Sequence, residues 1–244
     1  MFGWRARIGL IIPSNNTVME YEFSRTVPEG VSVHTARLGR VMDSTWETLI
    51  KMSDHVERAA EELASCDVDI IIYGCTSGSF LKGPKFEEEL TERICRISGV
   101  PSFTTSKAVL EALRSLGSKK IAIASPYSQE TNEAEKKFLE AKGFRILRME
   151  GLGIIRPTDI GRLSPYQAYA MAKRVNSEEA DTLFISCTDF RTFEIITALE
   201  KDLGKKAVSS NQASLWMAIK LLTLDAGALG HKLGSLFSHS LEKT

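Results

Sequence analysis

Short runs of apolar and β-branched residues alternate along the chain with longer segments in which apolar residues recur every three or four positions. The short runs predict strands at residues 7–12, 31–38, 70–73, 102–104, 121–124, 145–152, 182–186 and 207–209. The longer segments predict helices at residues 53–65, 87–97, 107–116, 131–142, 165–176, 190–203 and 212–224. In the first of these helices we expect Ser53 to be the cap and Val56, Ala60 and Leu63 to share one face. Because parallel strands need a long connection, this alternation predicts an α/β fold with parallel sheets.

The two halves of the chain repeat each other. Three pairs of segments are alike: 7–14 (RIGLIIPS) with 120–128 (KIAIASPYS), 69–76 (DIIIYGCT) with 181–188 (DTLFISCT) and, more weakly, 105–113 (TSKAVLEAL) with 210–218 (SNQASLWMA). Pro13 and Pro126 are 113 positions apart, and Cys75 and Cys187 are 112 apart. This repeat predicts two pseudo-symmetric lobes, each a parallel sheet flanked by helices. We expect residues 1–105 and 212–244 to form the first lobe, residues 106–211 the second, and the site to lie in the cleft between them.

Composition excludes several classes of function. The 244 residues include 31 Lys and Arg against 31 Asp and Glu, so the chain lacks the positive field that gathers nucleic acid. The longest apolar runs fall far below the roughly 20 residues that cross a membrane. The apolar residues before Pro13 are too few for the core of a signal peptide. We therefore expect a cytoplasmic protein. None of the four cysteines forms a C-x-x-C pair, so we expect reduced thiols and neither disulfides nor a zinc site.

Two of the cysteines follow apolar strands at equivalent points of the repeat. Cys75 is followed by T-S-G and Cys187 by T-D. Ligands of open parallel sheets bind beyond the carboxyl ends of the strands, where the first N–H groups of helices are free. A thiol beside such donors can have its pKa lowered toward neutrality, which makes it a base or a nucleophile. Small buried residues at strand ends are the alternative. A two-fold axis through the cleft brings both thiols to one ligand and favours the functional interpretation.

The turns after the first strand of each half are polar. Pro13 is followed by S-N-N-T, which includes Ser14 and Asn16, and Pro126 is followed by Tyr127 and Ser128. One such side chain is enough to cap a helix. The remaining donors of the first turn are expected to bind a carboxylate.

Other features indicate structure more than chemistry. The histidines lack the spacing of metal ligands, so no metal is expected. The GLG of residues 151–153 lacks the rest of a dinucleotide fingerprint, so no cofactor is expected. We expect Cys66 and Cys95 to fill the core. Asp189 and Arg191 adjoin Cys187 and are expected to cap, to pair with a charge or to touch the substrate.

On these motifs the chain resembles the aspartate/glutamate racemase superfamily, and within it the branch of maleate cis-trans isomerases and arylmalonate decarboxylases. The resemblance covers nearly the whole length through the segments GLIIPSNNTVME (9–20), YGCTSG (73–78), ASPY (124–127), GLGI (151–154) and SCT (186–188). It implies that Cys75 and Cys187 are the catalytic pair, that Asn16 binds a substrate carboxylate and that Tyr127 donates a hydroxyl to one. It also implies a homodimer or homotetramer.

The resemblance has two departures. Thr76 and Ser77 match the dioxyanion-binding pair of the decarboxylases, which lack the first cysteine. Since this chain has both cysteines, it stands nearer to the isomerases and racemases. Pro157 takes the position at which maleate isomerases carry a second substrate-binding asparagine. Because proline has no N–H donor, this departure leaves the identity of the substrate undecided.

The leading hypothesis is a cofactor-independent isomerase of a small carboxylate or dicarboxylate. In it the thiolate of Cys75 adds to an alkene carbon, Cys187 exchanges a proton with the neighbouring carbon, and donors that include Thr188 stabilise the charge. A racemase of an amino acid or a hydantoin would use the thiols as two opposed bases. A decarboxylase of a substituted malonate would use Cys187 as the proton donor. A carboxylate-binding protein without turnover is a further alternative, against which the intact pair of thiols argues.

Overall fold

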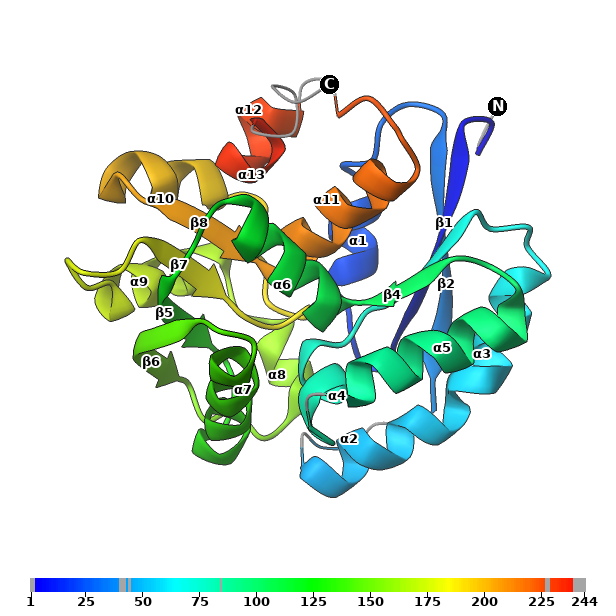
Figure 1. The fold of residues 1–244 in the computed structure, drawn as a ribbon, viewed down its shortest axis with the longest axis horizontal. Coiled ribbons are helices and arrows are strands. Elements are labelled where there is room, and N and C mark those ends of the chain that lie inside the picture. Colours follow the sequence, from blue (N-terminus) through cyan, green and yellow to red (C-terminus); the bar gives the residue numbers. More distant parts are fainter. Residues whose placement is uncertain (1–2, 40–42, 44, 84, 227–228, 239–244) are drawn as a thin grey trace.

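The computed structural model describes residues 3–39, 43, 45–83, 85–226 and 229–238. It contains two four-stranded parallel sheets flanked by helices (Figure 1). The first half of the chain forms β1 (Ala6–Pro13), α1 (Met19–Ser24), β2 (Val31–Leu38), α2 (Trp46–Met52), the 3-10 turn η1 (Ser53–His55), α3 (Val56–Ala64), β3 (Ile70–Tyr73), α4 (Thr76–Phe80), α5 (Phe86–Ser98) and β4 (Ser102–Thr104). The second half forms α6 (Thr105–Ser115), β5 (Lys120–Ser125), α7 (Gln129–Ala141), β6 (Arg145–Gly151), α8 (Pro157–Ile160), α9 (Pro165–Val175), β7 (Thr182–Ile185), α10 (Ile196–Leu203), β8 (Lys206–Ser209), α11 (Ser210–Leu221), α12 (Leu229–Leu233) and α13 (Ser235–Ser238).

The two sheets have the same topology, which confirms the predicted fold class. Their strand orders are β2-β1-β3-β4 and β6-β5-β7-β8, so each strand of the first sheet has its counterpart in the second. All neighbouring strands are parallel. In each sheet the polar turn follows the first strand of the half and the cysteine follows the third. The exact division of the chain into lobes stays a prediction.

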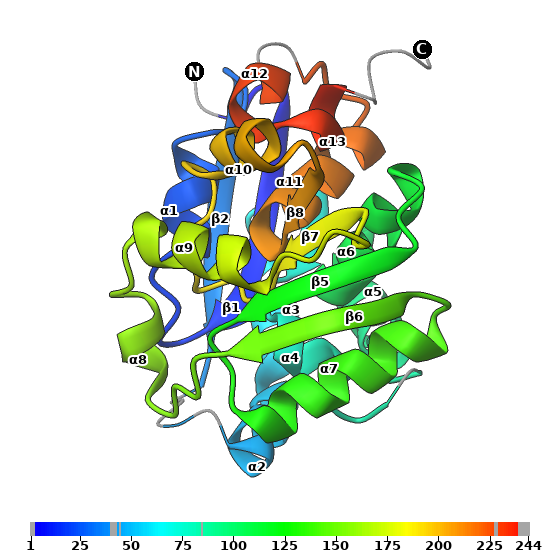
Figure 2. The same ribbon diagram turned by 90° about the vertical axis from the view of Figure 1, so that its left-hand side faces the viewer.

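Helices α6 and α11 pack against each other between the two sheets (Figure 1). They start at equivalent points of the repeat, where the side chains of Thr104 and Ser209 accept hydrogen bonds from the N–H groups of Lys107 and Gln212. These contacts replace partners that the first turn of a helix otherwise lacks. Helix α7 covers the second sheet beside β6 (Figure 2). The carboxyl ends of the strands of both sheets remain free to form a site.

Two predicted helices begin later than expected. The prediction of a helix from 190 to 203 is wrong at its start, because α10 begins at Ile196. The preceding N–H groups of Thr192 and Phe193 donate instead to the carboxylate of Glu22, 170 and 171 positions away. Ser53 does not cap the helix that follows it: it opens the turn η1, and its hydroxyl donates to the carbonyl of Ile50.

The expectation that Cys66 fills the core is wrong. Cys66 is exposed and its thiol donates to the carbonyl of Glu62, while Cys95 is partly buried. No helix within the described ranges has the length and apolar character needed to cross a membrane.

Candidate active site

A cavity lies at the carboxyl ends of the strands of both sheets. Its empty space of about 550 Å³ includes open solvent. Its described lining residues come from the ends of β1, β3, β5 and β7 and the turns after them, and from α2, α4, α7 and α8: Pro13, Asn15, Asn16, Leu49, Cys75, Thr76, Ser77, Tyr127, Ser128, Thr131, Pro157, Ile160, Cys187, Thr188 and Asp189. The structure therefore brings the two repeat-related thiols to one cavity.

Cys75 is the N-cap residue of α4. Its backbone is extended, and its sulfur accepts a hydrogen bond from the N–H of Gly78 at 3.3 Å. The hydroxyl of Ser77 lies 3.9 Å from the same sulfur. An added Cβ at Gly78 would lie 2.9 Å from the sulfur, so only glycine lets the N–H approach the thiol this closely.

Cys187 lies in a different local structure. Its φ of 107° is unusual for a residue other than glycine, and such strained backbone is concentrated at functional sites. Its sulfur accepts a hydrogen bond from the N–H of Asp189 at 3.4 Å. Its own N–H donates to the hydroxyl oxygen of Ser210, which also accepts a hydrogen bond from Thr76. Ser210 thus connects the turns of the two thiols.

Burial controls the ionisation of both thiols. It raises the pKa of Cys75 to about 11, although the Gly78 N–H and the Ser77 hydroxyl act in the opposite direction. Burial raises the pKa of Cys187 further above its ordinary value, and the nearby carboxyl of Asp189 adds to this shift. The expectation of a pKa lowered toward neutrality is therefore wrong, because removal from water outweighs the local donors. Cys75 is the more easily ionised of the two.

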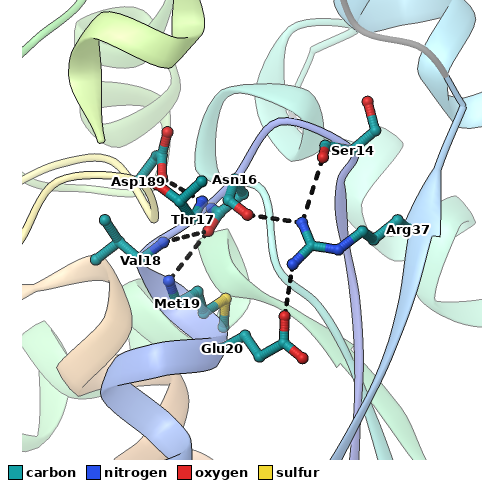
Figure 3. Close-up of polar contacts among 8 residues, drawn as sticks. All are labelled: Ser14, Asn16, Thr17, Val18, Met19, Glu20, Arg37 and Asp189. Atoms are coloured by element: carbon teal, nitrogen blue, oxygen red, sulfur yellow. Dashed lines mark hydrogen bonds and ion pairs between the residues drawn. The ribbon is translucent and has the colours of Figure 1, made fainter. Parts of the chain in front are cut away.

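The polar turn after β1 makes hydrogen bonds to Arg37, to Asp189 and to the N–H groups at the start of α1 (Figure 3). The side-chain oxygen of Asn16 accepts hydrogen bonds from the N–H groups of Val18 and Met19, and its amide nitrogen donates to Thr188 at 3.0 Å. The guanidinium of Arg37 donates to the carbonyl of Asn16 at 2.7 Å and pairs with Glu20. Asn16 therefore binds the N–H groups at the start of α1 and also contacts the Cys187 turn.

The Cys187 turn is anchored by a buried carboxylate from the other half of the chain. Glu22 of α1 accepts hydrogen bonds from the N–H groups of Thr192 and Phe193 and from the side chain of Asn211. The same Asn211 nitrogen donates to the carbonyl of Thr188 at 3.0 Å. Burial raises the pKa of Glu22 to about 7. Sequence reasoning did not identify Glu22 or Asn211, because neither adjoins a cysteine or a polar turn in sequence.

A second buried carboxyl lies behind Cys187. Glu135 of α7 accepts a hydrogen bond from Ser186 at 2.5 Å, and burial raises its pKa to about 8. The hydroxyl of Tyr127 stabilises the thiolate form of Cys187 by a hydrogen bond, and burial raises the pKa of Tyr127 well above its ordinary value. Tyr127 is therefore a neutral donor.

Most of the residues singled out in the sequence line the cavity. Asn16, Thr76, Ser77, Tyr127 and Thr188 do so together with the two thiols. Ser14 is not among the described lining residues, and its carbonyl accepts a hydrogen bond from Arg37 at 3.3 Å. The apolar walls formed by Leu49 and Ile160 could not be predicted from the sequence, because isolated apolar residues carry no chemical signal.

Comparison with known proteins gives a consistent result. The sequence model of the family described as arylmalonate decarboxylase matches residues 8–237. The maleate isomerase of Geobacillus stearothermophilus is 27% identical over 232 residues, which are 89% of this chain and 92% of that protein.

Two solved structures share the fold. The structure of the Nocardia farcinica maleate cis-trans isomerase bound to TRIS has a TM-score of 0.90 and 25% identity, and covers 97% of this chain and 99% of the other. A cysteine-to-serine mutant of the Nocardia farcinica enzyme, with a covalently bound succinylcysteine intermediate, has a TM-score of 0.86 and 25% identity, and covers 90% of this chain and 93% of the other.

Proposed function

The chain belongs to the arylmalonate decarboxylase family, and we propose that it is a cofactor-independent isomerase that converts a small cis-alkenoate to its trans isomer. The observation that carries this proposal is the presence of Cys75 and Cys187, from equivalent points of the repeat, in the lining of one cavity. Relatives named maleate isomerase, which align over most of this chain, support the reaction class.

In the first step the thiol of Cys75 gives its proton to solvent, and the thiolate adds to one alkene carbon. A carbon–sulfur bond forms, the carbon–carbon double bond becomes single, and its electron pair moves to the neighbouring carbon and the carboxylate beside it. Cys187 then gives its proton to that neighbouring carbon. The succinylcysteine found in the Nocardia farcinica mutant is the type of adduct that this step would form.

In the second step the intermediate rotates about the new single bond. The Cys187 thiolate takes the proton back, the double bond forms again in the trans arrangement, and the Cys75 thiolate leaves. No atom or electron is gained or lost over the cycle, so the chemistry requires no external reductant or oxidant.

The difference between the two pKa values supports this assignment of roles. The cycle needs one thiolate and one thiol, and the pKa of Cys75 is the lower of the two. The carboxyl of Asp189 raises the pKa of Cys187 and favours its protonated form. Cys75 is therefore the nucleophile and Cys187 the proton donor.

Donors around the cavity stabilise the negative charge that develops on the carboxylate. Tyr127 offers its neutral hydroxyl, and Thr76 and Ser77 begin α4, where N–H groups lack helical partners. Asn16 donates one amide hydrogen to Thr188, which leaves its second hydrogen for a substrate oxygen. Thr188 receives this bond and donates to the carbonyl of Gly74, so it fixes Asn16 against the substrate.

Decarboxylation is the second candidate, because the matching family model is that of arylmalonate decarboxylase. In that reaction a malonate loses carbon dioxide and Cys187 protonates the remaining carbanion. Cys75 would have no role, so its presence in the cavity favours isomerisation. Racemisation would use the same two thiols as acid and base on opposite faces of a stereocentre.

Proton NMR in deuterated water separates these reactions in one experiment. The enzyme is incubated in turn with maleate, a substituted malonate, aspartate and a hydantoin. We expect trans-alkene signals from the alkenoate only. Carbon dioxide release from the malonate, or exchange of an α-hydrogen without alkene isomerisation, would instead establish one of the alternatives.

We also propose a reducing compartment, the cytoplasm, as the place of action. All four cysteines are free thiols, and the mechanism requires two of them reduced.

A further inference from the structure

The cavity contains an acidic side chain without a cationic neighbour in its lining. Asp189 is the one ionisable carboxyl among the described lining residues, which include no Lys, Arg or His. Its side chain is 6% exposed. A dianionic dicarboxylate would therefore be held beside a third negative charge, with no positive side chain in the described lining to offset it.

Only one of the two Asp189 oxygens has hydrogen-bond partners. The first, Oδ1, accepts from the N–H of Thr17 at 2.7 Å and from its hydroxyl at 3.4 Å. The second, Oδ2, is buried without a hydrogen-bond partner in the structure. Buried polar atoms are nearly always paired, so an unpaired oxygen in a ligand cavity indicates a partner on the ligand.

The wall next to this carboxyl supplies no donor. An added Cβ at Gly161 would lie 3.1 Å from both Asp189 oxygens and 2.3 Å from the hydroxyl oxygen of Thr17, so the end of α8 lies against one side of the carboxyl. The residues of α8 that line the cavity, Pro157 and Ile160, have apolar side chains, and Pro157 also lacks an N–H.

We propose that Asp189 is a specificity-determining residue that accepts a hydrogen bond from the substrate, and that the substrate carries one carboxylate and, at its other end, a donor such as an amide. This inference rests on the proposed isomerase and narrows its substrate class to the half-amide of an alkene dicarboxylate. The donors from Asn16, Tyr127 and the start of α4 bind the carboxylate, and Asp189 binds the opposite end.

The ionisation of Asp189 agrees with this assignment. Burial raises its pKa to about 7, against the effect of the Thr17 hydrogen bonds, of the backbone N–H of Val18 and of the Arg37 charge. The other titratable groups that it faces are the thiols of Cys75 and Cys187, which are neutral at this pH. Above pH 7 the carboxylate accepts only, and below pH 7 it gains a proton that a second carboxylate can accept.

The test compares two saturated, unreactive probes, succinate and succinamate, by calorimetric titration. At pH 8.5 we expect the wild type to bind succinamate at least about tenfold more tightly, the typical effect of one hydrogen bond to a charged group. In D189N the preference is expected to vanish or reverse, because the amide can still accept from Thr17 but can also donate to a carboxylate. Equal preference in the two proteins, or tighter binding of succinate by the wild type at pH 8.5, overturns the proposal.

A measurement on the unmodified protein guards against a folding defect in the variant. Lowering the pH from 8.5 to 6.5 should reduce the preference of the wild type for succinamate several-fold, and an unchanged preference contradicts the role of Asp189. Turnover is followed separately with maleate and maleamate. If neither is isomerised while succinamate is still preferred, the proposed reaction fails and the specificity of the site stands.

Discussion

Cys75 caps a helix that starts at the next residue, whereas Cys187 opens a loop that continues to Ile196 before a helix begins. The first thiol receives a helix N–H and lies near a hydroxyl, and the second lies beside a carboxyl on a strained backbone. The two turns occupy equivalent positions in sheets of identical topology. The repeat therefore places two thiols in one cavity, and the different local structures after them give the two thiols different acidities.

Removing each thiol should separate the two roles most strongly. We expect C75A and C187A each to lower kcat/KM on the isomerised substrate by at least about 10³-fold, since each removes a reacting group. In C187A the adduct on Cys75 takes its proton slowly from solvent, and no Cys187 thiolate removes it again, so addition of the substrate mass is expected on the Cys75 peptide in mass spectrometry. C75A should form no adduct. An adduct on Cys187 in C75A would reverse the assignment.

The difference in acidity should appear in alkylation rates. With neutral iodoacetamide at pH 9 we expect Cys75 to react about tenfold or more faster than Cys187, because the thiolate is the reactive form and the pKa of Cys75 is the lower. Peptide mass spectrometry over time gives both rates, and the exposed Cys66 provides an internal control. Faster labelling of Cys187 would contradict the conclusion that Cys75 has the lower pKa of the two.

The buried carboxyl of Glu22, which binds the loop after Cys187, should make the stability of the protein depend on pH. The pKa of Glu22 is raised to about 7, so the folded protein holds a proton that the unfolded chain releases above pH 4.5. The contribution of Glu22 to the free energy of unfolding should therefore fall as the pH rises from about 5 to 7, by roughly 1 kcal/mol per pH unit, and be level above that range, while Glu135, whose pKa is raised to about 8, adds a further fall up to about pH 8. Thermal unfolding of E22Q should lose this part of the slope.

The matched control for that measurement is E61Q, which changes an exposed carboxyl on α3. It should retain the slope of the wild type. An E22Q protein whose unfolding temperature varies with pH as steeply as the wild type would show that Glu22 is not the group responsible.

The smallest expected effect comes from removing the Ser77 hydroxyl that lies near the Cys75 sulfur. Ser77→Ala removes a hydroxyl 3.9 Å from its sulfur, which should raise the pKa of Cys75 and lower kcat/KM by about three- to tenfold. Ser98→Ala, on α5 away from the cavity, is the control. Unchanged kinetics together with an unchanged alkylation rate of Cys75 would show that the Ser77 hydroxyl does not lower the pKa of Cys75.

The fold and the location of the site followed from the repeat in the sequence. The nearly equal spacing of Pro13 with Pro126 (113 positions) and of Cys75 with Cys187 (112 positions) predicted matching sheets, since hydrophobic pattern and turn residues act locally. The start of α10 could not be predicted this way, because Glu22 binds the N–H groups of Thr192 and Phe193 from far away in the chain.

Ionisation was the other property that the sequence did not predict. The motif after each cysteine correctly indicated nearby N–H donors, which lower a thiol pKa, but not the depth of burial, which raises it more. Asp189 appeared as one of several possible partners of Cys187. Its unpaired oxygen depends on the packing of α8 and Gly161, which three-dimensional contacts alone determine.

The positive φ of Cys187 has a consequence for how this protein would respond to selection for heat resistance. Glycine adopts such a conformation without penalty, while other residues lose on the order of 1–3 kcal/mol there. The exchange of Cys187 for glycine would therefore relieve strain and abolish turnover at the same time. A laboratory screen that selects only for thermal stability would enrich inactive variants at this position. Such a screen must therefore also measure the reaction.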